Sequence, residues 1–308
     1  MNTNELNTYI KNYLEHDKTQ RAIMITAPWG FGKSYYIKND LCKFLHDNKL
    51  DFAIVSLYGI ESLKEINKEL FLEIKLRKAH KRFGAWAKTI LSGTAVVGKT
   101  LLKQLAKVDI DFNIKEPNYE KIYKSIDLKD RLIIFEDLER ASIDIVEFLG
   151  YVNNLVEQDG VKVLLVANEK EIMQYENAIN NGKEEQKLTD KSKKYLKIKE
   201  KTICDTINFY SDNYESIKSI LEKFNNKYFK SLLQEDKNGD LLLVKKIEEQ
   251  MLKEQCMNYR SLLFACQKTE DMLNLLDKNK NYNLGFIENL FIGTIIYSIK
   301  LNKGDKNV

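Results

Sequence analysis

Two short stretches place a lysine and a hydroxyl residue directly after a glycine, an arrangement that proteins use to hold phosphate groups. They are "APWGFGKS", residues 27–34, and "GTAVVGKT", residues 93–100. The phosphate-loop pattern is G-x-x-x-x-G-K-S/T, in which backbone N–H groups surround the anion and the lysine neutralises it. The second stretch satisfies this pattern at every position, whereas the first has Ala27 in place of the first glycine.

The sequence around each stretch decides between them. A phosphate loop needs a buried strand before it and a helix after it, because the N-terminal end of the helix points its positive charge at the anion. The loop at 27–34 follows the apolar run "RAIMIT" and precedes "SYYIKNDLCKFLHD", whose apolar residues have helical spacing. The stretch at 93–100 follows "FGAWAKTILS", which lacks a clean strand pattern. We therefore expect phosphate at 27–34 and a chance match at 93–100.

Within the first loop the residue types indicate separate roles. Gly30 and Gly32 would lie nearest to the phosphates, Lys33 would reach the β- and γ-phosphates, and the Ser34 hydroxyl would coordinate Mg²⁺. The alternative is a glycine turn with a surface lysine. The residues expected to contact the nucleotide here are Trp29, Gly30, Phe31, Gly32, Lys33, Ser34 and Tyr35.

A pair of acids supplies the second half of the expected chemistry. Glu136 and Asp137 follow four apolar residues in "LIIFEDLER", about 100 residues after the loop. Phosphoryl transfer needs an acid at the tip of a neighbouring strand to hold Mg²⁺, and usually a second one to orient the attacking water. In isolation the same two acids would only end a strand.

The elements that must position these residues alternate between strand and helix. Expected strands lie at 21–26, 51–59, 131–140, 161–169 and 202–209, and most are dense in aliphatic residues without alternation, as a sheet covered on both faces requires. A long helix is expected at 62–82 with Ser62 as its N-cap. The fold class predicted is α/β, with a mostly parallel five-stranded sheet flanked by helices. From about residue 213 the pattern is helical, with helices expected at 214–234, 240–257, 259–276 and 285–300.

Composition sets the broad class and the expected compartment. Hydrophobic residues make up 44% of the 308, the net charge is only +4, and the four cysteines form no C-x-x-C pair. These features favour free thiols in a reducing cytoplasm. The N-terminus lacks the pattern of a secretory signal, and no segment approaches the ~20 apolar residues of a membrane helix. We expect a cytoplasmic protein with two domains, 1–210 and 211–308, and a helical insertion at 83–118.

The two motifs resemble those of the KAP family of P-loop NTPases. That family is similar to the AAA and signal-transduction ATPases of the additional-strand class. Its loop has the form x-x-W-G-x-G-K-S/T, matched by "APWGFGKS", and its second motif ends in D-D-L-D-R, where this chain has "EDLER". The resemblance covers residues 20 to 210 and extends more loosely into the helical tail.

The resemblance implies roles for five side chains outside the loop. Glu136 falls at the metal position, where the family has aspartate, and Asp137 at the water-activating position. Arg140 would act on the γ-phosphate across a subunit interface, or simply pair with a neighbouring acid. Asn168, after the strand "VLLVA", would sense the γ-phosphate or only turn the chain. Arg260, in "NYRSLL", would reach the nucleotide as a lid arginine, or lie on a helix surface with Asn258 as N-cap.

Two basic stretches leave the choice of partner open. The run at 75–82, followed by the insertion at 83–118, fits a solvated helix and a helical hairpin, an anionic membrane surface, nucleic acid or a partner subunit. The stretch at 183–201 has eight lysines against four acids. It is expected to be a mobile, solvated loop, with a lysine-rich hinge at 187–201, or to follow a phosphate backbone.

Three functions are compatible with these residues. The first is a Mg²⁺-dependent ATPase whose nucleotide state drives assembly or conformational change, with a homo-oligomer or a separate effector protein as partner. Resemblance to prokaryotic family members places it in anti-phage defence. The second is a nucleotide-binding switch with little hydrolysis, suggested by Glu136 at the metal position. The third is a DNA-acting ATPase, suggested by the lysines at 183–201.

Overall fold

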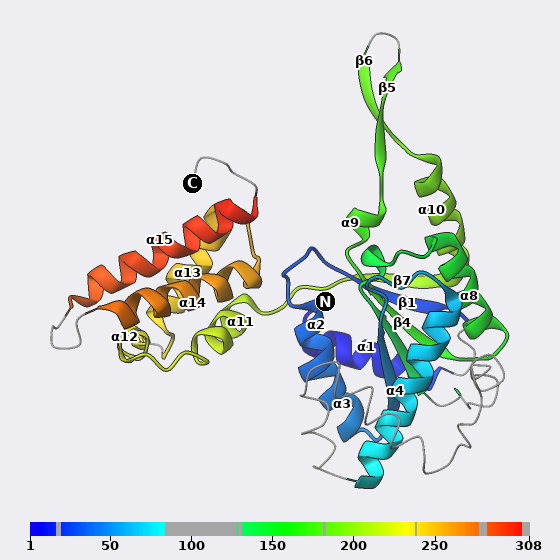
Figure 1. Cartoon of the computed structure of the whole chain (residues 1–308), viewed down its shortest axis with the longest axis horizontal. Coiled ribbons are helices and arrows are strands. Elements are labelled where there is room, and N and C mark those ends of the chain that lie inside the picture. The colour runs from blue at the N-terminus through cyan, green and yellow to red at the C-terminus, as the bar shows by residue number, and fades with distance from the viewer. Residues whose placement is uncertain are drawn as a thin grey trace. The chain divides into compact units, whose positions relative to one another are not determined.

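The chain forms two compact units in a computed structural model (Figure 1). The structure describes residues 1–16, 20–83, 128, 131–180, 183–237, 239–276 and 282–303. The sheet unit comprises Tyr9–Thr26 and Leu41–Asn208, and the helical unit comprises Met1–Thr8, Ala27–Asp40 and Phe209–Val308. The insertion at 83–118, including the motif at 93–100, lies almost entirely outside the described residues. The predicted domain bounds stay a prediction.

A five-stranded parallel sheet organises the sheet unit and confirms the predicted α/β class. Its spatial order is β2-β3-β4-β1-β7, and every neighbouring pair is parallel. The chain therefore returns over the sheet after each strand, which is why helices separate the strands in sequence. All five predicted strands are present: β1 (Ala22–Thr26), β2 (Asp51–Ser56), β3 (Arg131–Glu136), β4 (Lys162–Ala167) and β7 (Ile203–Asn208).

The register of the sheet brings the strand ends together. Thr26 at the end of β1 pairs with Ala167 of β4, and Ser56 at the end of β2 pairs with Glu136 of β3. Because the strands are parallel, the polar residues that follow them share one edge. β4 is the additional strand between β1, which leads into the glycine loop, and β3, which ends in the acids.

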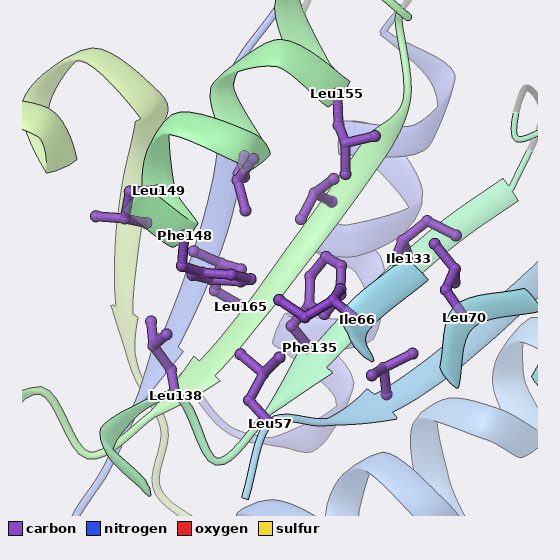
Figure 2. Packing of buried hydrophobic residues seen from close by; sticks show 14 of the residues in the cluster. Leu57, Ile66, Leu70, Ile133, Phe135, Leu138, Phe148, Leu149, Leu155 and Leu165 are labelled. Atoms are coloured by element: carbon purple, nitrogen blue, oxygen red, sulfur yellow. The ribbon is translucent and has the colours of Figure 1, made fainter. Parts of the chain in front are cut away.

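Apolar side chains on both faces of the sheet are buried. One face packs against α4 (Leu63–Phe83), α8 (Ile145–Glu157) and α10 (Asp190–Thr202). Figure 2 shows Phe148 of α8 beside Phe135 and Leu165 of the sheet, and the two phenyl rings meet edge to face at 5.3 Å. On the other face Tyr13 of α1 (Thr3–Glu15) accepts a hydrogen bond from the backbone of Val163. Burial on both faces explains the unbroken aliphatic runs of the strands.

The helical run after the glycine loop contains an unpredicted π-helical segment. It consists of α2 (Lys33–Tyr35), the π-helix η1 (Tyr36–Leu41) and α3 (Cys42–Asp47). Within the helical unit, Tyr36 is buried, donates to Asn7 Oδ1 at 2.7 Å and lies 5.0 Å from the ring of Phe209. Single π turns inside helices occur frequently at functional sites.

The predictions of a mobile loop at 183–201 and of a hinge at 187–201 are wrong. Instead β5 (Tyr175–Asn180) and β6 (Lys183–Leu188) form an antiparallel hairpin that projects from the sheet unit, and α10 follows it (Figure 1). The high lysine content of this stretch suggested a solvated segment, although it also contains residues that favour the helix α10. Thr189 caps α10 through Ser192 N, and Tyr195 is fully buried. Lys199 forms an ion pair with Glu169, and both side chains are largely buried.

The helical unit contains the predicted helices, with one divided in two. The expected helix at 214–234 is α11 (Asn213–Leu221) followed by α12 (Lys227–Leu232), because the Asn226 side chain starts a new helix by accepting from Tyr228 N. The others are α13 (Leu242–Lys253), α14 (Tyr259–Leu275) and α15 (Leu284–Asn302). In the core, Phe229 of α12 meets Phe291 of α15 edge to face at 5.1 Å.

α15 meets a criterion that the sequence analysis overlooked. Among the described helices it is the one long and apolar enough to cross a membrane by length and composition, with 19 residues. Core helices pass the same test. Ile287, Phe291, Ile295 and Ile299 on one face of α15 are fully buried in the helical unit.

Truncation of Phe148 tests the packing of the sheet unit. Phe148→Ala removes a fully buried ring and is expected to lower the free energy of unfolding by about 3–5 kcal/mol. Tyr175→Ala makes the same kind of truncation at a ring that is 57% exposed, and should change it by no more than about 0.5 kcal/mol. Urea unfolding followed by circular dichroism measures both. Equal losses would contradict the core position of Phe148.

Candidate functional site

The glycine loop owes its shape to two residues in the left-handed region. Gly30 has φ 81° and Gly32 has φ 84°, a conformation that costs other residues energy because of their Cβ. Ala27, at the position where the standard pattern has glycine, does not have a positive φ. The missing first glycine is therefore compatible with the backbone that the loop adopts.

Lys33 lies across the loop. Its Nζ donates to the carbonyl oxygens of Ala27 at 2.5 Å and Pro28 at 3.1 Å. The lysine near the end of the loop is therefore hydrogen-bonded to the two residues at its start. Gly32 begins the following helix by accepting from Tyr36 N at 2.9 Å. Ser34 stands in the first helical turn, where backbone N–H groups have no intrahelical acceptor. Trp29 and Tyr35 are exposed, and Phe31 is half-buried.

The topology of the sheet marks the edge where a ligand is expected. From β1 the chain crosses to β2 at one side of the sheet, and from β4 it crosses to β7 at the other. Neighbouring strands whose connections leave in opposite directions open a crevice at their carboxyl ends, where ligands of open α/β sheets bind. Thr26 and Asn168 end these two strands. Thr26 Oγ1 accepts from Glu169 N at 3.1 Å, which joins the two strand ends.

The two acids differ in their surroundings. Glu136 is the last residue of β3 and only 3% exposed. Asp137 follows in the left-handed conformation, φ 59° and ψ 37°, and begins the 3₁₀ turn η3 (Leu138–Arg140). Non-glycine residues in this region are uncommon, and they gather at functional sites where the surrounding structure holds them. The turn directs the Asp137 carboxylate toward the end of β2.

Ser56 is a site residue that the sequence analysis missed. Its Oγ donates to Asp137 Oδ2 at 3.0 Å and lies 3.4 Å from Tyr58 N, which can donate to it. A hydroxyl has a single proton to donate, so Ser56 uses it on the carboxylate. The sequence does show that Ser56 is a polar residue at the end of an expected strand. It does not show that this strand, β2, lies beside β3.

Arg140 and Asn168 lie at the same edge. Arg140 ends η3, with its guanidinium 5.7 Å from the centroid of the Tyr58 ring, and its carbonyl accepts from Gly59 N at 3.2 Å. Asn168 is 4% exposed and directly precedes the short helix α9 (Glu169–Ile172), which its side chain does not cap. The parallel sheet thus places Glu136, Asp137, Arg140 and Asn168 at one edge, as strand-end residues.

Arg260 belongs to the helical unit and is exposed in the first turn of α14. Asn258 caps this helix, with its Oδ1 accepting from Arg260 N at 3.0 Å, so the predicted cap is confirmed. The neighbouring Tyr259 N donates to Gly30 O at 2.9 Å, which brings the start of α14 to the glycine loop. The lid role of the Arg260 side chain stays a prediction.

The acids fit a metal that arrives with a nucleotide. Among the described residues no group of three or more His, Cys, Asp and Glu side chains could hold a metal ion by itself. Mg²⁺ in nucleotide sites needs only one or two carboxylates, because phosphates and water supply its other ligands. Glu136, at the carboxyl end of β3, supplies one such carboxylate within the sheet unit.

A parallel α/β sheet, a glycine loop with lysine after β1 and acids after β3 define a P-loop NTPase. The chain matches the KAP family P-loop domain over residues 2–283, and it belongs to that family. Membership implies binding and hydrolysis of a nucleoside triphosphate. No curated protein matches the chain.

The chain is also similar to solved structures, among them three with sequence identities of 12% to 15%. A structure of C. elegans PCH-2 is 13% identical, with 97% of this chain and 69% of that one covered, at a TM-score of 0.47. A DNA replication initiation factor is 12% identical, with 97% and 88% covered, at 0.32. The replication initiator DnaA bound to AMPPCP and single-stranded DNA is 15% identical, with 96% and 86% covered, at 0.30.

The hydrogen bond between Ser56 and Asp137 predicts that substituting either residue lowers kcat, and that the loss is larger for Asp137. Asp137→Asn should lower kcat for nucleotide hydrolysis by roughly 10²–10⁴-fold, because an amide cannot accept the proton of the attacking water. Ser56→Ala should lower kcat roughly tenfold through one lost hydrogen bond to a charged group. Steady-state kinetics would measure both.

Ser231→Ala is the matched control for Ser56→Ala. It removes an exposed serine hydroxyl that donates to the carbonyl of Lys227 within its own helix, and it should leave kcat unchanged. If Ser56→Ala raised KM and left kcat unchanged, the hydrogen bond from Ser56 would not prepare Asp137 for the predicted role in water activation.

Proposed function

We propose that the chain is a Mg²⁺-dependent ATPase that uses its nucleotide state to change conformation or assembly. The observation that carries this proposal is the loop at 27–34. Two glycines in the left-handed conformation and a lysine held across the loop follow the strand beside the switch point of the sheet. Backbone N–H groups and a lysine in this setting suit the β- and γ-phosphates.

The acids complete the proposed reaction. Buried Glu136 is assigned to Mg²⁺, and Asp137, oriented by Ser56, to the attacking water. The water loses its proton to Asp137 as its oxygen attacks the γ-phosphorus, and the bond to the β-phosphate oxygen breaks, leaving ADP and phosphate. Asn168 is assigned to sensing the γ-phosphate. Arg140 is assigned to the γ-phosphate of a neighbouring copy, and Arg260 to the bound nucleotide.

A second function is favoured by one specific observation. Glu136, one methylene longer than the aspartate of the family pattern, is almost fully buried at the metal position. Poor metal geometry would slow turnover and leave a nucleotide-binding switch with little hydrolysis. A DNA-acting ATPase receives less support, because Lys199 of the basic stretch is used in an internal ion pair.

The biological setting is proposed on resemblance. Prokaryotic members of the family are similar to proteins of anti-phage defence, and we extend that role, with a cytoplasmic location, to this chain. A homo-oligomer or a separate effector protein would receive the signal.

Substitution of two lysines tests the nucleotide site. Lys33→Ala is expected to abolish ATP hydrolysis and to weaken ATP binding, because it removes the charge that meets the phosphates. Lys99→Ala, in the stretch that fits the pattern perfectly, should leave both unchanged. Phosphate release and calorimetry with MgATP measure these effects. Unchanged binding and turnover in Lys33→Ala would overturn the proposal.

Solution mass measured with and without ATP separates the functions. A gain in mass with ATP, abolished by Lys33→Ala, supports nucleotide-driven assembly. Binding at Lys33 without turnover favours the switch. Turnover that rises with DNA and falls steeply with salt would favour the DNA-acting ATPase.

A further inference from the structure

The glycine loop has a direct hydrogen bond to the start of α14, within the helical unit. Gly30 O accepts from Tyr259 N at 2.9 Å, and Tyr259 is the first residue of α14. The N–H groups in the first turn of a helix have no acceptor within that helix. The bond therefore gives the Tyr259 N–H an acceptor, and it fixes the direction of the carbonyl at the centre of the loop.

Side-chain contacts reinforce this bond. A Cβ on Gly30 would lie 1.9 Å from Oδ1 and 2.3 Å from Cγ of Asn258, so the amide occupies the space that any other residue at position 30 would need. The Tyr259 ring lies on the next glycine, where a Cβ on Gly32 would be 3.8 Å from the ring atoms. Both left-handed residues of the loop thus lie against the start of α14.

Tyr259 is itself held firmly. Its ring is buried, its hydroxyl donates to Asn213 Oδ1 at 2.8 Å, and it accepts from Ser211 Oγ at 2.9 Å. Burial raises the pKa of this hydroxyl, which keeps it protonated as a donor. Asn213 is the first residue of α11. Tyr259 therefore connects the glycine loop to the starts of two helices.

The helix after the loop repeats the connection to α11. Tyr35 Oη lies 3.3 Å from Ser219 Oγ, and the ammonium of Lys223 lies 5.1 Å from the centroid of the Tyr35 ring. Ser219 is on α11, and Lys223 lies just after the C-terminal end of that helix. The loop and its helix are thus held at three points by α11 and α14.

We infer that Asn258 and Tyr259 are positioning residues that pre-organise the glycine loop for phosphate. They hold Gly30 and Gly32 in the left-handed conformation while Lys33 spans the loop. The start of α14 then sets nucleotide affinity through the loop backbone, separately from any contact of Arg260 with the nucleotide. This inference rests on the proposed function, because it assigns the loop to phosphate. Pre-organisation strengthens binding because the loop loses less conformational freedom when the ligand arrives.

Tyr259→Pro compared with Tyr259→Ala isolates the key hydrogen bond. Both remove the ring, but only proline removes the N–H. Position 259 is the first residue of α14, where proline is well tolerated. Asn258 before it is already extended, with φ −87° and ψ 102°, as a residue preceding proline should be. The two variants should therefore form the same helix.

The fluorescence of Trp29 can report how firmly the loop is held when no nucleotide is present. The chain has two tryptophans, so a Trp86→Phe background leaves only Trp29, next to Gly30. Acrylamide should quench its fluorescence more readily in Tyr259→Pro than in Tyr259→Ala. Binding of a non-hydrolysable ATP analogue should be roughly twofold to tenfold weaker in the proline variant. In kinetics the loss should appear in KM, with kcat nearly unchanged.

The outcomes separate the inference from the proposed function. Equal Trp29 quenching in the two variants would overturn the inference, whatever the nucleotide results. If quenching differs but Lys33→Ala still binds nucleotide normally, the loop is held as inferred and the proposed nucleotide site fails. Should Tyr259→Pro lower the helix content, Asn258→Gly takes its place, since glycine is an acceptable N-cap and removes the amide from Gly30. Its Trp29 quenching must then exceed that of the Trp86→Phe parent.

Discussion

The parallel hydrogen-bond ladder is the constraint on which the rest of the sheet unit depends. Parallel strands in register end at a common edge, so one polar residue after each strand suffices to assemble a site. β2, β3, β4 and β1 contribute Ser56, Glu136, Asn168 and Thr26 in this way. No loop has to fold over the sheet to collect these residues. The helices that the parallel connections require cover both faces, and their burial keeps the strands from shifting by one residue, which would turn every side chain to the other face.

Unusual backbone conformations occur at the points where chemistry is assigned. Gly30, Gly32 and Asp137 all adopt the left-handed region. For the glycines the conformation carries little steric cost, whereas Asp137 is held there by its surroundings. Ser56 on β2 and the 3₁₀ turn after Asp137 provide those surroundings. The sheet unit thus maintains Asp137 in an orientation that an isolated strand end would not retain, and the start of α14 does the same for the glycine loop within the helical unit.

Sequence patterns were informative where local chemistry is sufficient. The order strand, glycine loop, helix could be predicted because loop and helix have recognisable residues, and the five strands were found because burial on both faces demands aliphatic runs. Sequence patterns gave a wrong prediction where a highly charged segment is packed against the rest of the protein. The lysine content of residues 187–201 predicts a hinge, although Tyr195 and Ser192 anchor a helix there and Lys199 is paired with Glu169. Composition over a window cannot distinguish a lysine in water from a lysine in an ion pair, since the partner lies 30 residues away.

The local conformations and the residue types at the strand ends can be predicted from the sequence alone. They are the two glycines, the lysine, the paired acids and the caps such as Asn258. Only the tertiary structure decided which of these residues are neighbours. The sequence does not contain the order β2-β3-β4-β1-β7, so the bond from Ser56 to Asp137 could not be anticipated. Nor could the contact of Tyr259 with Gly30, which joins residues 229 positions apart. The physical reason is the same in both cases: local propensity depends on a few adjacent residues, whereas contact between distant segments depends on how whole surfaces pack.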